Sequence, residues 1–192
     1  SIIKKMRPRR CQLSVPASSK KMIEKAASIK VDGVILDLED SVAPDQKESA
    51  RHQIIDGLTQ LEWKASSISV RINATNTEWC HQDIIELVSS CSEKIATLIV
   101  PMVNTPNDLI FVETLIKQLA IKNSSAAEIG IEGLIETVEG LSNVDKIAQS
   151  SEKLEALVLG MGDYAASQRM RINTIGDVSS EAGDIWQYPR YR

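Results

Sequence analysis

The sequence has few of the residues on which several classes of protein depend. Its three cysteines, Cys11, Cys80 and Cys91, are odd in number and have no metal-ligand spacing, which is typical of reduced thiols in an intracellular protein. Its two histidines, His52 and His81, stand alone on helix-like stretches, and we predict that both lie on the surface. A zinc site and a Ser/His/Asp triad therefore have little support.

Long apolar runs and an excess of positive charge are also lacking. No stretch approaches the ~18–20 consecutive apolar residues of a membrane span, so we expect no membrane partner. The formal net charge of -4 gives no reason to expect nucleic acid. The one basic run, over residues 4–10, is followed at once by polar residues rather than an apolar stretch. This favours a solvated arm or a phosphate-facing rim over a targeting signal.

What the sequence does contain is a regular alternation of strand-like and helix-like segments. Short β-branched runs predict strands at Leu13–Pro16, Gly33–Leu38, Ser67–Ile72, Thr97–Pro101, Ile129–Ile135 and Ala156–Leu159. Helical spacing predicts helices at Lys20–Ile29, Gln46–Leu58, Gln82–Ser90, Asn107–Leu119 and Leu141–Ala148. Such alternation predicts a single α/β domain over residues 1–192, with a parallel sheet covered by helices. Two architectures remain open: a doubly wound sheet, or a (β/α)8 TIM barrel with about six βα units present.

Polar side chains follow five consecutive predicted strands. In a parallel barrel the loops after the carboxyl ends of the strands form the active face, so these side chains are expected to converge on one mouth. A polar loop residue is ordinary by itself, but the joint placement predicts a functional site. The residues are Asp37, Glu39 and Asp40 after the second strand, Arg71 and Asn73 after the third, Met102 and Asn104 after the fourth, Glu136 and Thr137 after the fifth, and Asp163 after the sixth.

The residue types at these positions favour metal-assisted chemistry on an anionic substrate. Glu136 and Asp163 are hard oxygen donors with no histidine or cysteine beside them, which favours Mg²⁺ over zinc. Arg71 lies between them and the other carboxylates, and a planar guanidinium is suited to a substrate carboxylate or a developing oxyanion. A metal and an arginine together stabilise enolates and polarise carbonyl groups.

Five blocks of sequence carry a resemblance to a known family. They are Arg10-x-x-Leu13-x-Val15-Pro16, Val34–Pro44 with Lys47 and Ala50-Arg51 behind it, Val70–Asn73, Ile135-Glu136-Thr137-x-x-Gly140, and Gly160–Ser167. Together they resemble the citrate lyase β-subunit and malyl-CoA lyase family of the HpcH/HpaI aldolase superfamily, over nearly the whole chain. The last block is more similar to the malyl-CoA lyase-like branch.

The resemblance implies a carbon–carbon lyase that works by a retro-Claisen or retro-aldol reaction. A 2-hydroxyacyl-CoA of the malyl-CoA, β-methylmalyl-CoA or citramalyl-CoA type would be cleaved to an acyl-CoA and a 2-oxo acid, with Mg²⁺ as cofactor. The family also implies a cytoplasmic enzyme (mitochondrial matrix in a eukaryote) that assembles as a homo-oligomer, a trimer or hexamer in relatives.

The same resemblance implies roles for individual residues. Glu136 and Asp163 would ligate Mg²⁺ and, with Gly162, bind the substrate. Arg71 would hold the oxo-acid end and stabilise charge as the C–C bond breaks, while Glu39 and Asp40 would order Arg71 or metal-bound waters. The coenzyme A part of the substrate is expected to meet Ser14, Ser19 and Lys25.

The sequence departs from the family pattern after the fourth strand and near its end. Relatives carry Pro-Lys-Val-Glu where this chain reads Pro101-Met102-Val103-Asn104, which suggests an altered pocket or weakened activity. Ser14 replaces a large aromatic residue, and Lys20 or Lys21 stands in for a basic residue expected near Ser19. The family's last barrel units and its C-terminal lid are not in the sequence.

These departures leave alternatives open and carry a structural expectation. The alternatives are a citrate lyase β-subunit-like protein, a thioesterase, a catalytically impaired relative that binds CoA esters, and an aldolase acting on free 2-oxo acids. The aldolase is disfavoured because neither histidine ends a strand. Six strands leave two sheet edges unpaired, and we expect apolar side chains on the inner face to lack an opposing layer, namely Val34, Leu36, Val70, Leu98, Val100, Leu134 and Val158.

Overall fold

A computed structural model describes residues 10–160 of the chain. The six strands are β1 (Gln12–Pro16), β2 (Gly33–Asp37), β3 (Ser67–Arg71), β4 (Thr97–Val100), β5 (Gly130–Ile135) and β6 (Leu154–Leu159). The helices are α1 (Lys20–Ala27), α2 (Lys47–Gln60), α3 (Cys80–Cys91), α4 (Pro106–Ala120), α5 (Val138–Ser142) and α6 (Val144–Ala148), with 3-10 turns η1 (Pro44–Gln46) and η2 (Ser124–Glu128). Every strand predicted from the sequence within these residues is present, and so are four of the five predicted helices.

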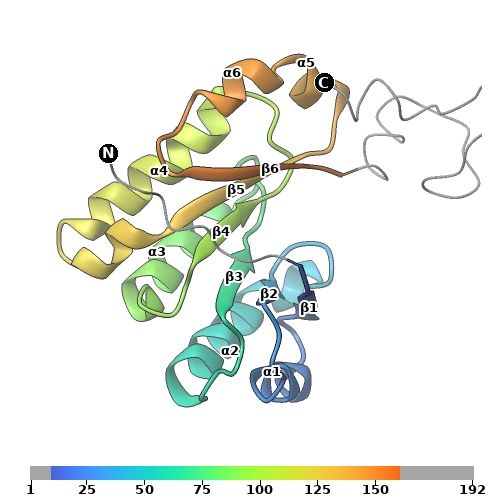
Figure 1. Cartoon of the computed structure of the whole chain (residues 1–192), viewed down its shortest axis with the longest axis vertical. Helices are drawn as coiled ribbons and strands as arrows, with labels where there is room; N and C mark the ends of the chain where they lie inside the picture. The colour runs from blue at the N-terminus through green and yellow to red at the C-terminus, as the bar shows by residue number, and fades with distance from the viewer. Residues whose placement is uncertain (1–9, 161–192) are drawn as a thin grey trace, which may run out of the picture.

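The strands form one parallel sheet in the order in which they occur in the chain, β1-β2-β3-β4-β5-β6. The helices α1 to α4 lie along one side of this curved sheet (Figure 1). A doubly wound sheet reverses its strand order and carries helices on both faces, so that architecture is excluded. The arrangement is that of a partial (β/α) barrel, as the sequence predicted.

The face of the sheet that packs on the helices was predicted wrongly. Val34, Leu36, Val70, Leu98 and Val100 were expected to line an uncovered inner face, but each is at most 1% exposed. Val100 pairs with Gly133, and a side chain at Gly133 would contact Leu109 of α4, so this face is the helix-covered one. Because side chains alternate along a strand, the opposite face carries the mouth residues and the polar barrel interior.

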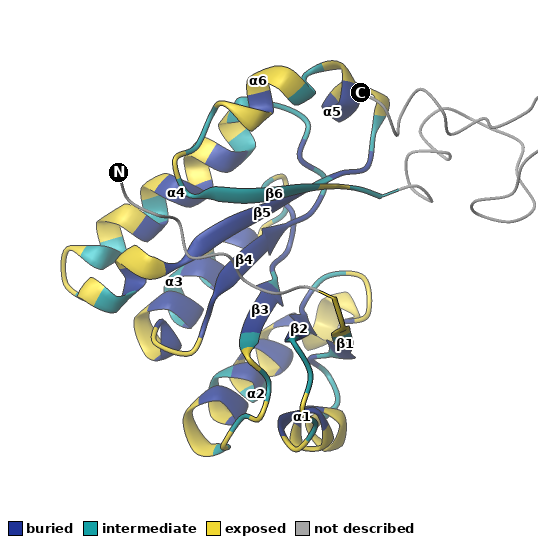
Figure 2. Cartoon of the chain, in the orientation of Figure 1, coloured by how far each residue is buried: buried dark blue, intermediate teal, exposed yellow. Residues whose placement is uncertain are grey.

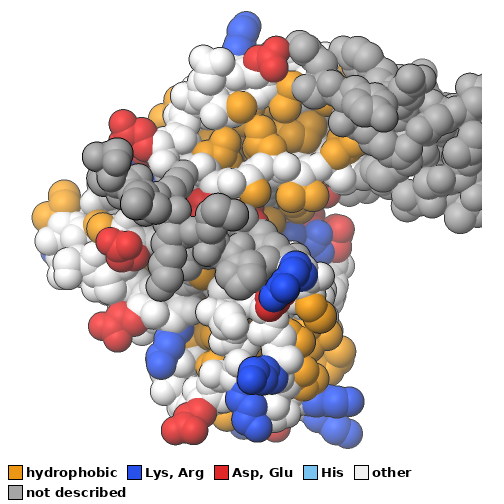
Figure 3. Space-filling view, in the orientation of Figure 1, with side chains coloured by type: hydrophobic (Ala, Val, Ile, Leu, Met, Phe, Trp, Pro, Cys, Tyr) orange, Lys and Arg blue, Asp and Glu red, His pale blue; other side chains and the backbone are white. Residues whose placement is uncertain are grey.

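The expectation for Leu134 and Val158 was correct. Leu134 is half-buried and Val158 is 49% exposed, on the face away from α4. Figure 2 shows β4 and β5 buried along their length, whereas β6 is of intermediate burial. Figure 3 shows hydrophobic side chains gathered between β6 and the helices α5 and α6. Uncovered apolar surface is therefore present at the β6 end of the sheet.

Local chemistry sets the helix boundaries near the mouth. Thr105 and Asp108 form a capping box at the start of α4, with Pro106 in its first turn. The predicted helix at residues 141–148 is instead two short helices that meet at Asn143. A side chain at Gly140 would overlap the backbone oxygen of Val103, so glycine permits α5 to approach the β4 loop.

The remaining predictions about cysteine and histidine agree with the structure. Cys80 and Cys91 are free and buried, and burial raises the pKa of each thiol to about 12. His52 and His81 are exposed on α2 and α3. Within residues 10–160, no helix has both the length and the apolar character needed to cross a membrane.

Candidate active site at the carboxyl ends of the strands

Arg71, the last residue of β3, is held by a carboxylate at the end of the neighbouring strand. Its Nε donates to Asp37 Oδ1 at 2.7 Å and its Nη2 to Asp37 Oδ2 at 2.8 Å. Asp37 and Arg71 are register partners across β2 and β3, so the pair follows from the sheet itself. Two parallel hydrogen bonds fix the plane of the guanidinium, which remains 22% exposed at the mouth.

Asp37 is also bound by the loop that follows its own strand. Its oxygens accept hydrogen bonds from Glu39 N at 2.9 Å, from Ser41 N at 3.1 Å and from Ser41 Oγ at 2.5 Å. Burial alone would raise the pKa of Asp37, but the hydrogen bonds from Arg71, Ser41 and Glu39 outweigh it and lower the pKa to about 2. Asp37 is therefore a permanent negative charge beneath the guanidinium.

Glu39 and Asp40 lie farther from Arg71 than Asp37 does. Arg71 Nη1 is 3.4 Å from Glu39 Oε2 and 3.8 Å from Asp40 Oδ2. Burial raises the pKa of Glu39 to about 7; the charge of Arg71 opposes this shift and that of Asp40 adds to it. The two predicted ordering residues do surround Arg71, but Asp37 makes the strong contact.

Lys47, in the first turn of α2, holds the loop that carries Glu39. Its buried Nζ donates to Leu38 O at 2.8 Å and to Glu39 O at 2.6 Å, and it lies 5.4 Å from the ring centre of Trp79. Burial lowers the pKa of Lys47. With Asp37 binding the loop's amides and Lys47 its carbonyls, the backbone of residues 37–41 is fixed from both sides.

Glu136, the predicted metal ligand after β5, is 6% exposed and is positioned by two backbone segments. Its Oε2 accepts from Met102 N at 2.8 Å. Gly160, after β6, packs against the side chain so closely that a Cβ there would lie 2.5 Å from Glu136 Cγ. Met102 has a φ of 52°, a left-handed conformation that costs roughly 1–2 kcal/mol for a residue with a side chain. The Met102 amide is thus turned toward the carboxylate at an energetic cost.

Asn104 and Thr137 join the β4 and β5 loops. Thr137 Oγ1 donates to Asn104 Oδ1 at 2.5 Å, and Asn143 Nδ2 donates to Asn104 O at 2.9 Å. Thr137 also caps α5 by accepting from Gly140 N at 3.0 Å. Asn104 therefore makes structural contacts between neighbouring loops.

Asn73 was expected at the mouth, but it is buried beneath it. It is 2% exposed, and both its N and its Nδ2 donate to Asp83 Oδ2, at 3.0 and 2.7 Å. Asp83 also accepts from Arg51 Nε at 2.9 Å. These three residues fasten the end of β3 to α2 and α3, so Asn73 supports the loop rather than facing the mouth.

The three residues predicted to meet coenzyme A are not gathered at one point. Ser14 lies exposed on β1, whereas Ser19 caps α1 by accepting from Met22 N at 3.3 Å. Lys25 is exposed in the last turn of α1, about 9 Å farther along the helix axis than Ser19. An extended ligand is needed to contact all three.

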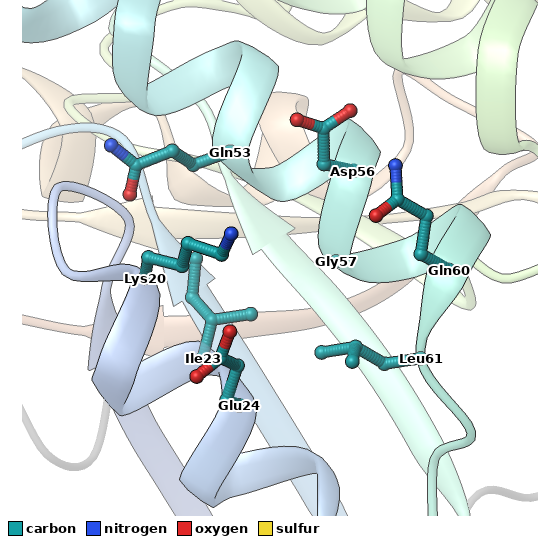
Figure 4. A pocket seen from close by; sticks show the side chains of 8 residues that line it. All are labelled: Lys20, Ile23, Glu24, Gln53, Asp56, Gly57, Gln60 and Leu61. Carbon is teal, nitrogen blue, oxygen red and sulfur yellow. The ribbon is translucent and has the colours of Figure 1, made fainter.

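A small pocket does lie beside α1, in the groove between α1 and α2 (Figure 4). It encloses about 100 Å³, and the side chains of Lys20, Glu24, Gln53 and Asp56 give it a polar rim. A Cβ at Gly57 would lie 2.7 Å from Ile23, which is why the two helices approach closely here. Lys20, one of the two lysines expected to substitute for a basic residue near Ser19, thus lies on this groove.

Two predicted site residues, Gly162 and Asp163, lie outside the described residues. Within residues 10–160 no cluster of three or more histidine, cysteine or acidic side chains has metal-binding geometry. Glu136 supplies one hard oxygen donor of fixed orientation, which fits the few protein carboxylates that Mg²⁺ takes. The donor chemistry of the described half of the site fits Mg²⁺.

From the sequence, Asp37 was named as a strand-end residue and Lys47 as part of a family block, but neither was given a role. The place of Asp37 at a strand end was visible in the sequence, but its pairing with Arg71 depends on the register of β2 against β3. For Lys47 the signal was weaker, since a lysine at the start of a helix is expected in solvent.

Comparisons with known proteins agree with this geometry. Residues 10–178 match the family described as HpcH/HpaI aldolase/citrate lyase. The L-malyl-CoA/β-methylmalyl-CoA lyase of Cereibacter sphaeroides is 36% identical over 170 residues, 88% of this chain and 54% of that protein. The Rhodobacter capsulatus enzyme of the same description is 38% identical over 167 residues, 87% of this chain and 52% of that protein.

A solved structure extends the likeness to three dimensions. The CitE protein of Mycobacterium tuberculosis in complex with magnesium and acetate is 25% identical, with a TM-score of 0.69 over 94% of this chain and 65% of that chain. The barrel-type fold is thereby confirmed. The chain spans about half the length of the curated relatives that it matches.

Proposed function

Since the chain belongs to the HpcH/HpaI aldolase/citrate lyase family, we propose that its strand-end residues serve a Mg²⁺-dependent carbon–carbon lyase. The substrate is a 2-hydroxyacyl-CoA of the malyl-CoA, β-methylmalyl-CoA or citramalyl-CoA type, and the products are an acyl-CoA and a 2-oxo acid. The similarity to malyl-CoA/β-methylmalyl-CoA lyases supports this substrate class.

The observation that carries the proposal is the fixed guanidinium of Arg71. The Nε–H and one N–H of Nη2 donate to Asp37, which leaves the donors on the Nη1 side of the partly exposed guanidinium for a ligand. That side presents two donors in one plane, which is the geometry that binds a carboxylate. Arg71 thus binds and orients the oxo-acid end of the substrate.

Mg²⁺, when bound, polarises the hydroxyl and carboxylate oxygens of the substrate. Glu136 would hold it together with Asp163, and Met102 N and Gly160 keep the Glu136 carboxylate in place. In the cleavage, the substrate hydroxyl loses its proton and becomes the carbonyl of the oxo acid. The electrons of the broken C–C bond pass to the acyl-CoA carbon, which then takes a proton. Arg71 offsets the negative charge on the departing oxo acid.

The coenzyme A part is assigned to Ser14, Ser19 and Lys25, with the pocket beside α1 in the same region. A pantetheine arm is long enough to reach from a strand end to the last turn of a helix. Assembly as a homo-oligomer and a cytoplasmic location belong to the same proposal.

A second candidate is a relative that binds CoA esters with little or no cleavage. Met102 and Asn104, which replace a lysine and a glutamate of the family pattern, favour it. Asn104 is committed to Thr137 and Asn143, so a loop contact has replaced an ionisable group near the metal side of the mouth.

A lyase assay separates the two candidates. The protein is incubated with malyl-CoA, β-methylmalyl-CoA or citramalyl-CoA, and the released glyoxylate or pyruvate is trapped as its phenylhydrazone, with Mg²⁺ or with a chelator. We expect Mg²⁺-dependent release from at least one ester, and a loss of more than tenfold in kcat/KM for Arg71→Lys, which keeps the charge but not the planar fork. Binding of the esters without release would favour the second candidate.

A further inference from the structure

One guanidinium at the mouth faces three carboxylates. Asp37 binds Arg71 at 2.7 and 2.8 Å, Glu39 lies 3.4 Å from its Nη1, and Asp40 lies 3.8 Å from the same atom. Asp37 is buried, Glu39 is 20% exposed and Asp40 is 69% exposed. The cluster therefore carries more negative than positive charge before any substrate arrives.

The N–H groups of Arg71 that do not bind Asp37 determine where an anion binds. Arg71 has five N–H groups, of which Asp37 takes the Nε hydrogen and one on Nη2. The remaining donors lie on the Nη1 side, which is the side that Glu39 and Asp40 face. A substrate carboxylate that binds Arg71 must therefore lie beside the carboxyl group of Glu39.

We propose that Glu39 takes up one proton when an anionic 2-oxo acid binds Arg71, so that a neutral carboxyl group lies beside the bound carboxylate. A protonated Glu39 no longer repels the ligand, and its O–H group becomes a donor to the ligand or to Asp40. This inference rests on the proposed function, because it requires Arg71 to be the group that binds the oxo acid.

The charges around Glu39 make it the group that responds. Arg71 approaches from β3, Asp37 and Asp40 belong to its own segment, and Lys47 of α2 binds its backbone oxygen. Burial has already raised the pKa of Glu39 to about 7, and Arg71 is the opposing influence. An anion on Arg71 weakens that opposition and adds a negative charge, and both effects raise the pKa further.

The two neighbouring carboxylates lie in different surroundings from Glu39. Asp37 has a pKa of about 2 and stays ionised because its hydrogen bonds favour the charged form. Asp40 is mostly in solvent, where water stabilises its charge. Glu39 combines partial burial with a 3.4 Å contact to Arg71 and one backbone hydrogen bond, from Asp40 N at 3.0 Å, so fewer donors stabilise its charge than that of Asp37.

The proposal fixes the sign of the pH dependence of binding. Below about pH 7 Glu39 is already protonated, and affinity for the oxo acid is independent of this group. Above that pH, binding requires a proton, so the dissociation constant rises as the pH rises. By linkage the rise approaches tenfold per pH unit until the pKa of the bound state is reached.

Calorimetry in paired buffers measures the proton directly. Glyoxylate is titrated into the protein at pH 8 with saturating Mg²⁺, in HEPES and in triethanolamine, whose ionisation enthalpies differ and whose tertiary amines do not condense with the aldehyde. We expect an uptake approaching one proton per site in the wild type and close to none in Glu39→Gln. Glu48→Gln, the same change at an exposed glutamate on α2, should retain the uptake. The wild-type measurement stands even if Glu39→Gln folds poorly.

The outcomes separate this inference from the proposed function. Binding of glyoxylate without proton uptake, or with equal uptake in Glu39→Gln, overturns the inference and leaves the lyase proposal in place. No binding of glyoxylate or pyruvate in the presence of Mg²⁺ overturns both, because Arg71 would then not be an oxo-acid site.

Discussion

Asp37 and Glu39 stand two residues apart in one loop, yet their pKa values are displaced in opposite directions. Both are partly or wholly buried, which raises the pKa of a carboxyl group. Asp37 receives hydrogen bonds from Arg71, Ser41 and a backbone amide, and its pKa falls to about 2. Glu39 accepts one hydrogen bond, from Asp40 N, and has one longer contact to Arg71, and its pKa rises to about 7. The number of donors, rather than burial alone, decides the sign.

The depressed pKa of Asp37 predicts a specific loss of stability in acid. Because the folded-state value of about 2 lies below the ordinary 3.8, the stabilisation is fully present above about pH 4 and is lost as the pH falls toward 2. The shift corresponds to about 2 kcal/mol. The free energy of unfolding in urea is measured for the wild type and for Asp37→Asn. The amount by which the wild type is more stable should be about 2 kcal/mol smaller at pH 2 than at pH 5.

The exposed Asp45, changed to asparagine, controls for net charge in this experiment. A stability difference between wild type and Asp37→Asn that is the same at pH 2 and pH 5 would show that the ionised form of Asp37 is not specially stabilised.

At this scale the sequence predicted which residues come together but not which pairs they form. Arg71, Glu39 and Asp40 were expected to meet, and they do. The partner that holds Arg71 is Asp37, and this depends on the register of β2 against β3. Register is set by packing across the whole sheet, which no local pattern in either strand reveals.

At the scale of the elements, a buried ionic cluster fastens α2 and α3 to the end of β3. Asp83 has no exposed side-chain surface and accepts hydrogen bonds from Arg51 and Asn73. Arg51 also donates to Glu86 at 3.0 Å. These contacts position the loop after Arg71, so the site depends on a polar core as well as an apolar one.

Removing one partner of this cluster should destabilise the fold strongly. Asp83→Ala leaves the guanidinium of Arg51 buried without its main acceptor, at a cost of about 3–5 kcal/mol. A double-mutant cycle with Arg51→Ala should show a clear coupling, with the double variant less destabilised than the sum of the single ones. Strictly additive losses in urea unfolding would contradict the buried pairing.

The elements themselves were predictable, whereas the face that each strand buries was not. Strands at 33–38 and 97–101 read as nearly continuous apolar runs, so their two faces looked alike. At 67–72, by contrast, Ser67, Ser69 and Arg71 alternate with apolar residues. Val34, Leu36, Val70, Leu98 and Val100 turned out to pack on the helices, and polar Ser69, Thr97 and Glu132 share the other face. Which of the strand-end side chains point to the inner face could therefore not be read from the sequence alone.

At the scale of the whole molecule, the described sheet ends in two strands with one neighbour each. Those strands are β1 and β6, and Val158 on β6 is 49% exposed. A strand edge with unpaired backbone groups and apolar side chains favours association with another chain.

We therefore expect a protein consisting of residues 1–192 alone to self-associate. Light scattering over a range of concentrations should give a mass above the 21.1 kDa of one chain. Val158→Lys, which places a charge on the exposed face of β6, should reduce the association. A monomer at every concentration, with slow amide exchange along β1 and β6, would contradict this prediction.

The central claim is that the strand-end residues form one metal-dependent site, and Mg²⁺ binding tests it most directly. Glu136→Gln keeps an oxygen acceptor for Met102 N but loses the charge, and Glu139→Gln makes the same change at an exposed position three residues away. Calorimetric titration should show that Glu136→Gln binds Mg²⁺ at least tenfold more weakly than the wild type, while Glu139→Gln binds it normally. Unchanged Mg²⁺ affinity in a folded Glu136→Gln protein would contradict the account.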